Sequence, residues 1–246
     1  MKKLIAIIMS AVMIFSVAAC GSKDDDEITS PTDNTMFDKS EGVMTYSQYD
    51  NAGVDTPVVI EAFVQAKQTW WDNKATIYLA DPDGAYFAYN MVCSEQEYAQ
   101  LTDGQKIRIS GVKSIWAGED EIIDGTFELC EGTWLSTPVD LTSEYAAENS
   151  SLSSHMNQRF RITNAKVTKT AIYEWDGTGT RGNDLYFKAE INGSTFDFVV
   201  ESYLCGAETA VYQTVEGLQV GQTIDMEGFL YWYEGPCPHI TSVTVK

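Results

Sequence analysis

The feature that most constrains the fold of this 246-residue chain is a motif that occurs twice. Leu101–Gly111 reads LTDGQKIRISG and Leu218–Gly228 reads LQVGQTIDMEG, so both copies spell L-x-x-G-Q-x-I-x-x-x-G at an offset of 117 residues. The same offset aligns Ile123 with Ile240 beyond the motif. Constant spacing over about 20 residues indicates one supersecondary unit used twice, and it predicts two domains of about 100 residues each.

The first copy has the pattern of five strands and one helix. Apolar residues alternate with polar ones from Pro57, and four further segments with strand patterns follow. Ser94, with Glu97 three residues later, is a capping box that predicts a short helix between strands three and four. The order strand, strand, strand, helix, strand, strand is that of the five-stranded OB-fold barrel. In this topology Gly111 lies in strand four, where a small barrel bends sharply.

The turn between strands two and three of the first barrel determines which side chains face outward. We expect the DPDG sequence, Asp81–Gly84, to form a three-residue loop whose glycine is left-handed. This loop would pair Leu79 with Phe87 and bury both. Tyr78 and Tyr86 would then lie on the outer face of the barrel.

The second copy repeats the order of the first. RFRITNAKVTKT, LYFKAEI and TFDFVVES have strand patterns, ETAVYQTVE has a helical one, and two further strand patterns follow. We therefore predict a mainly β protein of two consecutive five-stranded OB-fold barrels, each with a short helix between strands three and four. The predicted boundaries are a signal peptide at 1–20, a disordered acidic tether at 21–42, the first barrel at 43–135, a linker with a short helix at 136–158 and the second barrel at 159–246.

The first twenty residues have the pattern of a secretion signal. Lys2 and Lys3 precede the apolar run Leu4–Val17, which is short for a transmembrane helix and is followed by VAAC, ending at Cys20. This ending resembles the lipobox of bacterial lipoproteins, in which the cysteine is lipidated. We therefore expect an extracytoplasmic protein that the lipid on Cys20 anchors to the bacterial cell membrane. The alternatives are a plain signal peptide and a transmembrane anchor.

Charge and the motifs that are missing narrow the function. The chain has 36 acidic and 16 basic residues, a net charge of −20, and no cluster of Lys and Arg. This argues against a nucleic-acid partner, because nucleic-acid binders neutralise phosphates with a basic face. The two histidines lack a metal-binding spacing, and no P-loop, nucleophile elbow or dinucleotide fingerprint is present. We expect no catalytic residues, no metal and no cofactor.

Two further features are left with two interpretations each. Cys93 and Cys130, at the ends of neighbouring predicted strands, could form a disulfide outside the cytoplasm, and free thiols are the alternative. Aromatic residues at the first hairpin and on the outer face coincide with the region where OB-folds bind oligonucleotides and oligosaccharides, but such rings also pack between domains. The candidate ligand-binding residues are Trp70, Trp71, Tyr78, Tyr86, Trp116, Lys67 and Lys74.

Three segments resemble the tandem OB-fold lipoproteins of Gram-positive bacteria. They are EAFVQAKQTWWDNKATIYLADPDGAYFAYN and LTDGQKIRISGVKSIWAGEDEI in the first barrel and MNQRFRI in the second. The resemblance implies the architecture and supplies no function, because one fold hosts many functions. From the anchor, the paired barrels and the missing catalytic motifs, we expect a non-enzymatic binding module for an extracellular protein or glycan. The alternatives are single-stranded nucleic acid binding through the OB-folds and an enzyme that acts on an envelope polymer.

Overall fold

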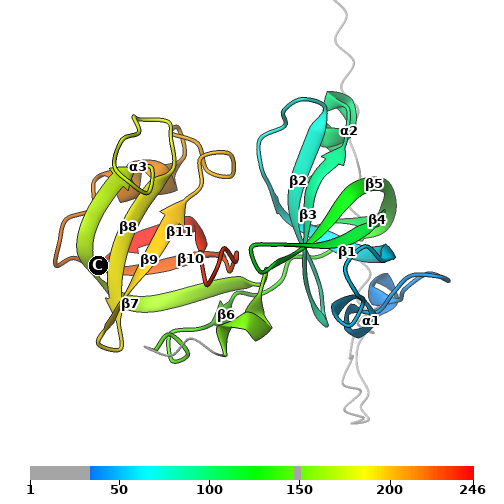
Figure 1. Ribbon diagram of the computed structural model, residues 1–246, viewed down its shortest axis with the longest axis horizontal. Helices are drawn as coiled ribbons and strands as arrows, with labels where there is room; N and C mark the ends of the chain where they lie inside the picture. The colour runs from blue at the N-terminus through cyan, green and yellow to red at the C-terminus, as the bar shows by residue number, and fades with distance from the viewer. Residues whose placement is uncertain (1–33, 147–150) are drawn as a thin grey trace, which may run out of the picture. The chain divides into compact units, whose positions relative to one another are not determined.

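The first five strands close into a barrel around the apolar face that their alternation creates. The computed structural model describes residues 34–146 and 151–246. Its first strands are β1 (Pro57–Lys67), β2 (Lys74–Asp81), β3 (Gly84–Val92), β4 (Gln105–Trp116) and β5 (Glu119–Thr133) (Figure 1). They are hydrogen-bonded in the order β1-β2-β3-β5-β4, with β5 parallel to β3, and β4 pairs with β1 to close the barrel. The helix α2 (Glu95–Gln100), opened by the predicted Ser94 capping box, connects β3 to β4. This is the OB-fold topology.

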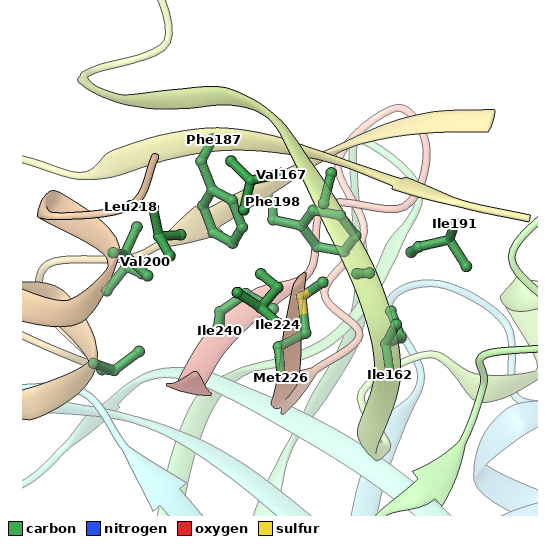
Figure 2. Close-up of a cluster of buried hydrophobic side chains, with 14 of the residues drawn as sticks. Ile162, Val167, Phe187, Ile191, Phe198, Val200, Leu218, Ile224, Met226 and Ile240 are labelled. Carbon is green, nitrogen blue, oxygen red and sulfur yellow. The ribbon is translucent and has the colours of Figure 1, made fainter. Parts of the chain in front are cut away.

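The remaining strands form a second sheet. They are β6 (Val139–Asp140), β7 (Arg159–Tyr173), β8 (Leu185–Ile191), β9 (Ser194–Val200), β10 (Thr223–Phe229) and β11 (His239–Val245). Their order is β10-β11-β9-β8-β7-β6, and β10 also pairs with β7. The short β6, which was not predicted, runs parallel to the start of β7. The helix α3 (Ala210–Glu216) connects β9 to β10 and buries Val211, Tyr212 and Val215. Figure 2 shows part of the core of this sheet, which contains Phe187, Phe198 and Met226.

Equivalent positions of the repeated motif have the same structural role in both copies. Ile107 and Ile224 are fully buried. Gly104 and Gly221 have left-handed backbones, with φ of +82° and +94°. The N–H of Gly104 donates to the Val64 carbonyl of β1, and the N–H of Gly221 donates to the Val167 carbonyl of β7. The motif therefore keeps glycine because other residues rarely adopt this conformation.

The β2–β3 turn is shorter than predicted. Asp81 pairs with Gly84 across a two-residue turn, and the Asp81 carboxylate accepts hydrogen bonds from the N–H groups of Asp83 and Gly84 at 2.8 and 2.9 Å. Gly84 is not left-handed. A Cβ at Gly84 would lie 2.4 Å from the ring of Tyr46, so the close approach of that ring explains the glycine.

The shorter turn shifts the register by one residue and exchanges the faces of β3. Leu79 pairs with Tyr86, and Tyr78 pairs with Phe87. Tyr86 is fully buried in the barrel core, whereas Phe87 lies on the outer face beside Tyr78. The predictions that Tyr86 faces outward and that Phe87 lies in the barrel core are therefore wrong, because a slip of one residue moves every side chain to the other face.

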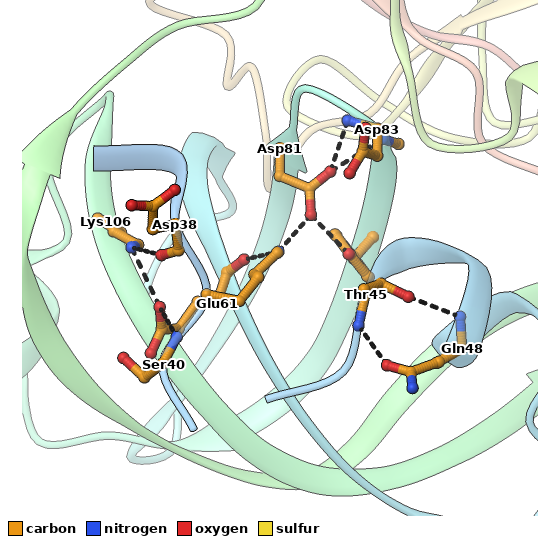
Figure 3. Close-up of polar contacts among 11 residues, drawn as sticks. Asp38, Ser40, Thr45, Gln48, Glu61, Asp81, Asp83 and Lys106 are labelled. Carbon is orange, nitrogen blue, oxygen red and sulfur yellow. Dashed lines mark hydrogen bonds and ion pairs between the residues drawn. The ribbon is translucent and has the colours of Figure 1, made fainter. Parts of the chain in front are cut away.

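The segment before β1 packs on the first barrel, although the tether was predicted to be disordered up to residue 42. The 3₁₀ helix η1 (Asn34–Phe37) places the Phe37 ring 5.7 Å from that of Phe63. Lys106 forms a 3.0 Å ion pair with Glu61 and donates to a backbone carbonyl of this segment (Figure 3). The helix α1 (Tyr46–Asp50) follows. The linker contains the 3₁₀ helix η2 (Leu152–His155), which follows the TSEYAAEN segment, 142–149, on which the linker helix was expected.

The cysteines of the described residues are all free: Cys93, Cys130, Cys205 and Cys237. Of the two interpretations of Cys93 and Cys130, the structure has the free thiols and not the disulfide. The parallel pairing of β3 with β5 covers only Phe87 and Ala88 on β3, and it ends before the strands reach these cysteines. Cys20 lies outside the described residues. Within the described ranges, no helix is both long enough and apolar enough to cross a membrane.

Candidate functional site

The second sheet covers the part of the outer face of the first barrel around Tyr78 and Phe87, where a ligand was expected. The Tyr78 ring stacks on that of Phe229, with centroids 4.4 Å apart and an angle of 13° between the planes. Both side chains form a buried cluster with Phe87. The Tyr78 hydroxyl lies 2.8 Å from Nδ1 of His239, so its polar group is also satisfied in the interface. Tyr78 is an interface residue, as the packing interpretation of these aromatic residues predicted.

A buried carboxyl lies in the same interface. Glu119 is fully buried, and its Oε2 accepts a hydrogen bond from the N–H of Trp232 at 2.8 Å. Its Oε1 and the side-chain oxygen of Asn157 are buried without a partner, and the Asn157 side chain lies within hydrogen-bonding reach of the carboxyl. Burial raises the pKa of Glu119 to about 9. Burial therefore favours the protonated, neutral form of this carboxyl at neutral pH.

Replacing Glu119 with glutamine should stabilise the protein at alkaline pH. The pKa of Glu119 is raised in the folded state, so folding stability decreases as the pH rises from about 4.5, the usual glutamate value, to about 9. Glutamine stays neutral, so Glu119→Gln should melt at a higher temperature than the parent at pH 9 and close to it at pH 4.5. Glu128→Gln, an exposed carboxyl on the same strand, is the control and should leave the pH profile unchanged. A variant that is equally destabilised at both pH values would contradict the neutral Glu119.

Beside the buried cluster, the two sheets form a groove of about 380 Å³ that aromatic side chains line. Trp71 comes from the β1–β2 connection, Tyr89 from β3, Tyr203 from the segment after β9 and Tyr231 from the segment after β10. Trp71, Tyr89 and Tyr203 are 56%, 44% and 54% exposed. We call this the aromatic groove and define it by these four rings. The N–H and the hydroxyl of Thr69 donate to the Tyr203 carbonyl at 2.6 and 3.0 Å. These two bonds connect the walls of the groove that the first barrel and the second sheet supply.

The groove is close to electrically neutral. Lys74 is the cation that lines it, and Lys74 pairs only loosely with Asp72, at 4.0 Å. Glu201 lines the groove as well, and burial raises its pKa to about 7, so its carboxyl is only partly ionised at neutral pH. Burial lowers the pKa of His239 to about 3, which keeps this ring uncharged. The aromatic groove therefore offers ring faces rather than a strong electric field.

Of the residues predicted to bind a ligand, only Trp71 and Lys74 line this groove. Trp70 is half-buried and donates its indole N–H to the backbone carbonyl of Cys93 at 2.8 Å. Lys67 lies 3.8 Å from the centre of the Tyr98 ring. Trp116 is 62% exposed at the far end of β4 and does not line the groove.

Sequence reasoning missed three of the four rings. Tyr89 lies on the same face of β3 as Phe87, two residues earlier. The correct register of β3 would therefore have placed Tyr89 on the outer face of the barrel. Tyr203 and Tyr231 lie more than 110 residues from Trp71 in the chain. No local pattern connects such distant residues.

Comparison with known proteins gives weak structural likeness and nothing else. No family model and no curated protein matches the chain. A replication protein A heterotrimer bound to ssDNA is similar at a TM-score of 0.37 and 12% identity, covering 80% of this chain and 51% of the other. The Ifi202 HINa domain in complex with 20 bp dsDNA is similar at a TM-score of 0.35 and 12% identity, and the match covers 78% of this chain and 96% of the other. The tetrameric p202 HIN2 is similar at a TM-score of 0.34 and 10% identity, and the match covers 79% of this chain and 96% of the other.

The molecules bound in these neighbours differ from the partner that the sequence analysis expected. The sequence was interpreted as a module for a protein or glycan, with its acidity arguing against nucleic acid. Two of these three structures contain DNA, which matches the alternative given above, nucleic acid, and not the expected protein or glycan. The error in the sequence reasoning was to treat net charge as decisive, since single strands also bind through stacking on aromatic rings. Likeness at this level describes the arrangement of strands, and the aromatic groove itself has to support the choice of ligand.

Proposed function

We propose that this chain is a non-enzymatic protein that binds single-stranded nucleic acid by stacking bases in the aromatic groove. The second sheet, closed by the β10–β7 pairing, would then be a second OB-type barrel that supplies one wall of the site. The observation that carries the proposal is the exposure of three large rings, Trp71, Tyr89 and Tyr203, in one groove. Exposed aromatic side chains that converge mark a binding surface, and unpaired bases present flat faces to them.

The charge of the chain determines how such binding should depend on salt. For single strands, the logarithm of the binding constant falls linearly with the logarithm of the salt concentration. Each phosphate contact adds roughly −0.7 to the slope of this line. Lys74 is the cation of the groove, while the chain as a whole carries a charge of −20, which repels the strand at low salt. We expect a slope between zero and about −1, much shallower than that of a basic single-strand binder.

Replacing Trp71 with alanine should weaken binding of a short fluorescein-labelled DNA strand by about tenfold, because one stacked base contributes about 1–3 kcal/mol. Fluorescence anisotropy at several salt concentrations measures both the affinity and its salt slope. Trp116→Ala is the matched control, since Trp116 is exposed to a similar extent and lies outside the groove. Equal loss in both variants, or affinity that disappears steeply with salt, would contradict stacking in this groove.

The place where the protein meets its ligand is a second part of the proposal. The lipobox-like ending at Cys20 supports a lipid anchor that holds the protein outside the cytoplasm, where it would meet extracellular nucleic acid. Cys20→Ala should move the protein from the membrane fraction of the native bacterium to the soluble fraction. Full retention of that variant on membranes would contradict the anchor.

A further inference from the structure

The aromatic groove contains a side-chain amide with no hydrogen-bond partner. The amide of Gln68 donates to Glu201 at 3.1 Å, and the hydroxyl of Thr69 donates to the carbonyl of Tyr203. Asn90 lines the same groove, and among the described residues its side chain forms no hydrogen bond. A free amide offers one group that donates and one that accepts, side by side. A ligand in the groove can use both at once.

The backbone at Asn90 places this residue in the lining of the groove beside Tyr89. Asn90 has a left-handed φ of +53°, and the pairing of β2 with β3 shifts between Ala75 and Ile77 opposite it. In a regular strand, Tyr89 and Asn90 would face opposite sides, but here both line the groove. The N–H of Asn90 donates to the buried hydroxyl of Thr76 at 3.1 Å, which stabilises the bend.

We propose that Asn90 selects the base that stacks in the aromatic groove, and that the selected base is adenine. A side-chain amide of asparagine matches the N6 donor and the N7 acceptor of adenine in a bidentate pair. In a single strand these atoms are free, because the base is neither paired nor enclosed in a duplex groove. The assignment rests on the proposed function, since it needs a base stacked on Trp71 or Tyr89 beside the amide.

Two variants separate the amide from the backbone conformation. Asn90→Gly keeps the left-handed conformation and removes the amide, while Asn90→Asp keeps the shape and replaces the amide donor with a second acceptor. Affinities of the full chain and both variants are measured by anisotropy with short labelled oligo-dA, oligo-dC and oligo-dT. Thermal unfolding of each variant shows that the fold is retained.

The parent should bind oligo-dA roughly tenfold more tightly than the other two strands, as expected for one bidentate pair. Asn90→Gly should bind all three strands alike, and Asn90→Asp should favour oligo-dC, because a carboxylate accepts from the N4 amino group of cytosine. Equal affinity of the parent for the three strands, or an unchanged preference in Asn90→Gly, would overturn the role of Asn90. If binding still depends on Trp71 in that case, the proposed function stands. A parent that binds none of the strands would overturn both.

Discussion

Replacing Gly228 with alanine is expected to reduce the free energy of unfolding by about 3 kcal/mol. A Cβ at this position would lie 2.2 Å from the carbonyl oxygen of His239 and 3.0 Å from its carbonyl carbon. These are backbone atoms of the paired strand β11, so they cannot move aside as a flexible side chain would. The pairing of β10 with β11 already shifts between Glu227 and Gly228, and relief of the clash would separate the two strands further. Urea unfolding followed by circular dichroism measures the loss.

Two other glycines provide the controls for this experiment. Gly111 has the equivalent position in the first barrel, where a Cβ would lie 2.6 Å from Ile122 and 2.9 Å from the carbonyl oxygen of Ile123. Gly111→Ala should therefore also lose stability. Gly53 precedes β1, and the nearest atom to its Cβ would be 3.8 Å away, so Gly53→Ala should have little effect. Equal unfolding midpoints for all three variants would show that the repeated glycine is not required at the bend.

Replacing Phe229 with alanine should destabilise the contact between the first barrel and the second sheet. Phe229 is 2% exposed and stacks on Tyr78, and truncation of a buried phenylalanine costs about 3–5 kcal/mol. Because this ring belongs to the interface cluster, we expect the parent to unfold in one transition and the variant in two. Calorimetry detects the second transition. Trp116→Ala removes an exposed ring of larger size and should leave one transition near the parental temperature. A single unshifted transition for Phe229→Ala would mean that the interface contributes little to stability.

Much of the first barrel follows from local patterns in the sequence. The alternation from Pro57 and the capping box at Ser94 each predicted the feature that the structure has, because strand faces and helix caps depend on neighbouring residues. The β2–β3 register did not follow, since Asp81–Gly84 is compatible with loops of two or three residues. The contact of Gly84 with the Tyr46 ring, from a helix more than 30 residues earlier, is specific to the shorter loop.

The binding site divides in the same way. By itself, the sequence determined the mainly β class and the repeated motif. It also supplied the lipobox-like start and two residues that line the groove, Trp71 and Lys74, because these features depend on spacing and residue type. Only the tertiary structure decided which rings are exposed: it buries Tyr78 between the sheets, and it brings Tyr203 to Trp71 across more than 130 residues of chain. The physical reason is that burial of a ring depends on what docks against it, and docking is determined by the packing of whole sheets rather than by any local pattern of residues.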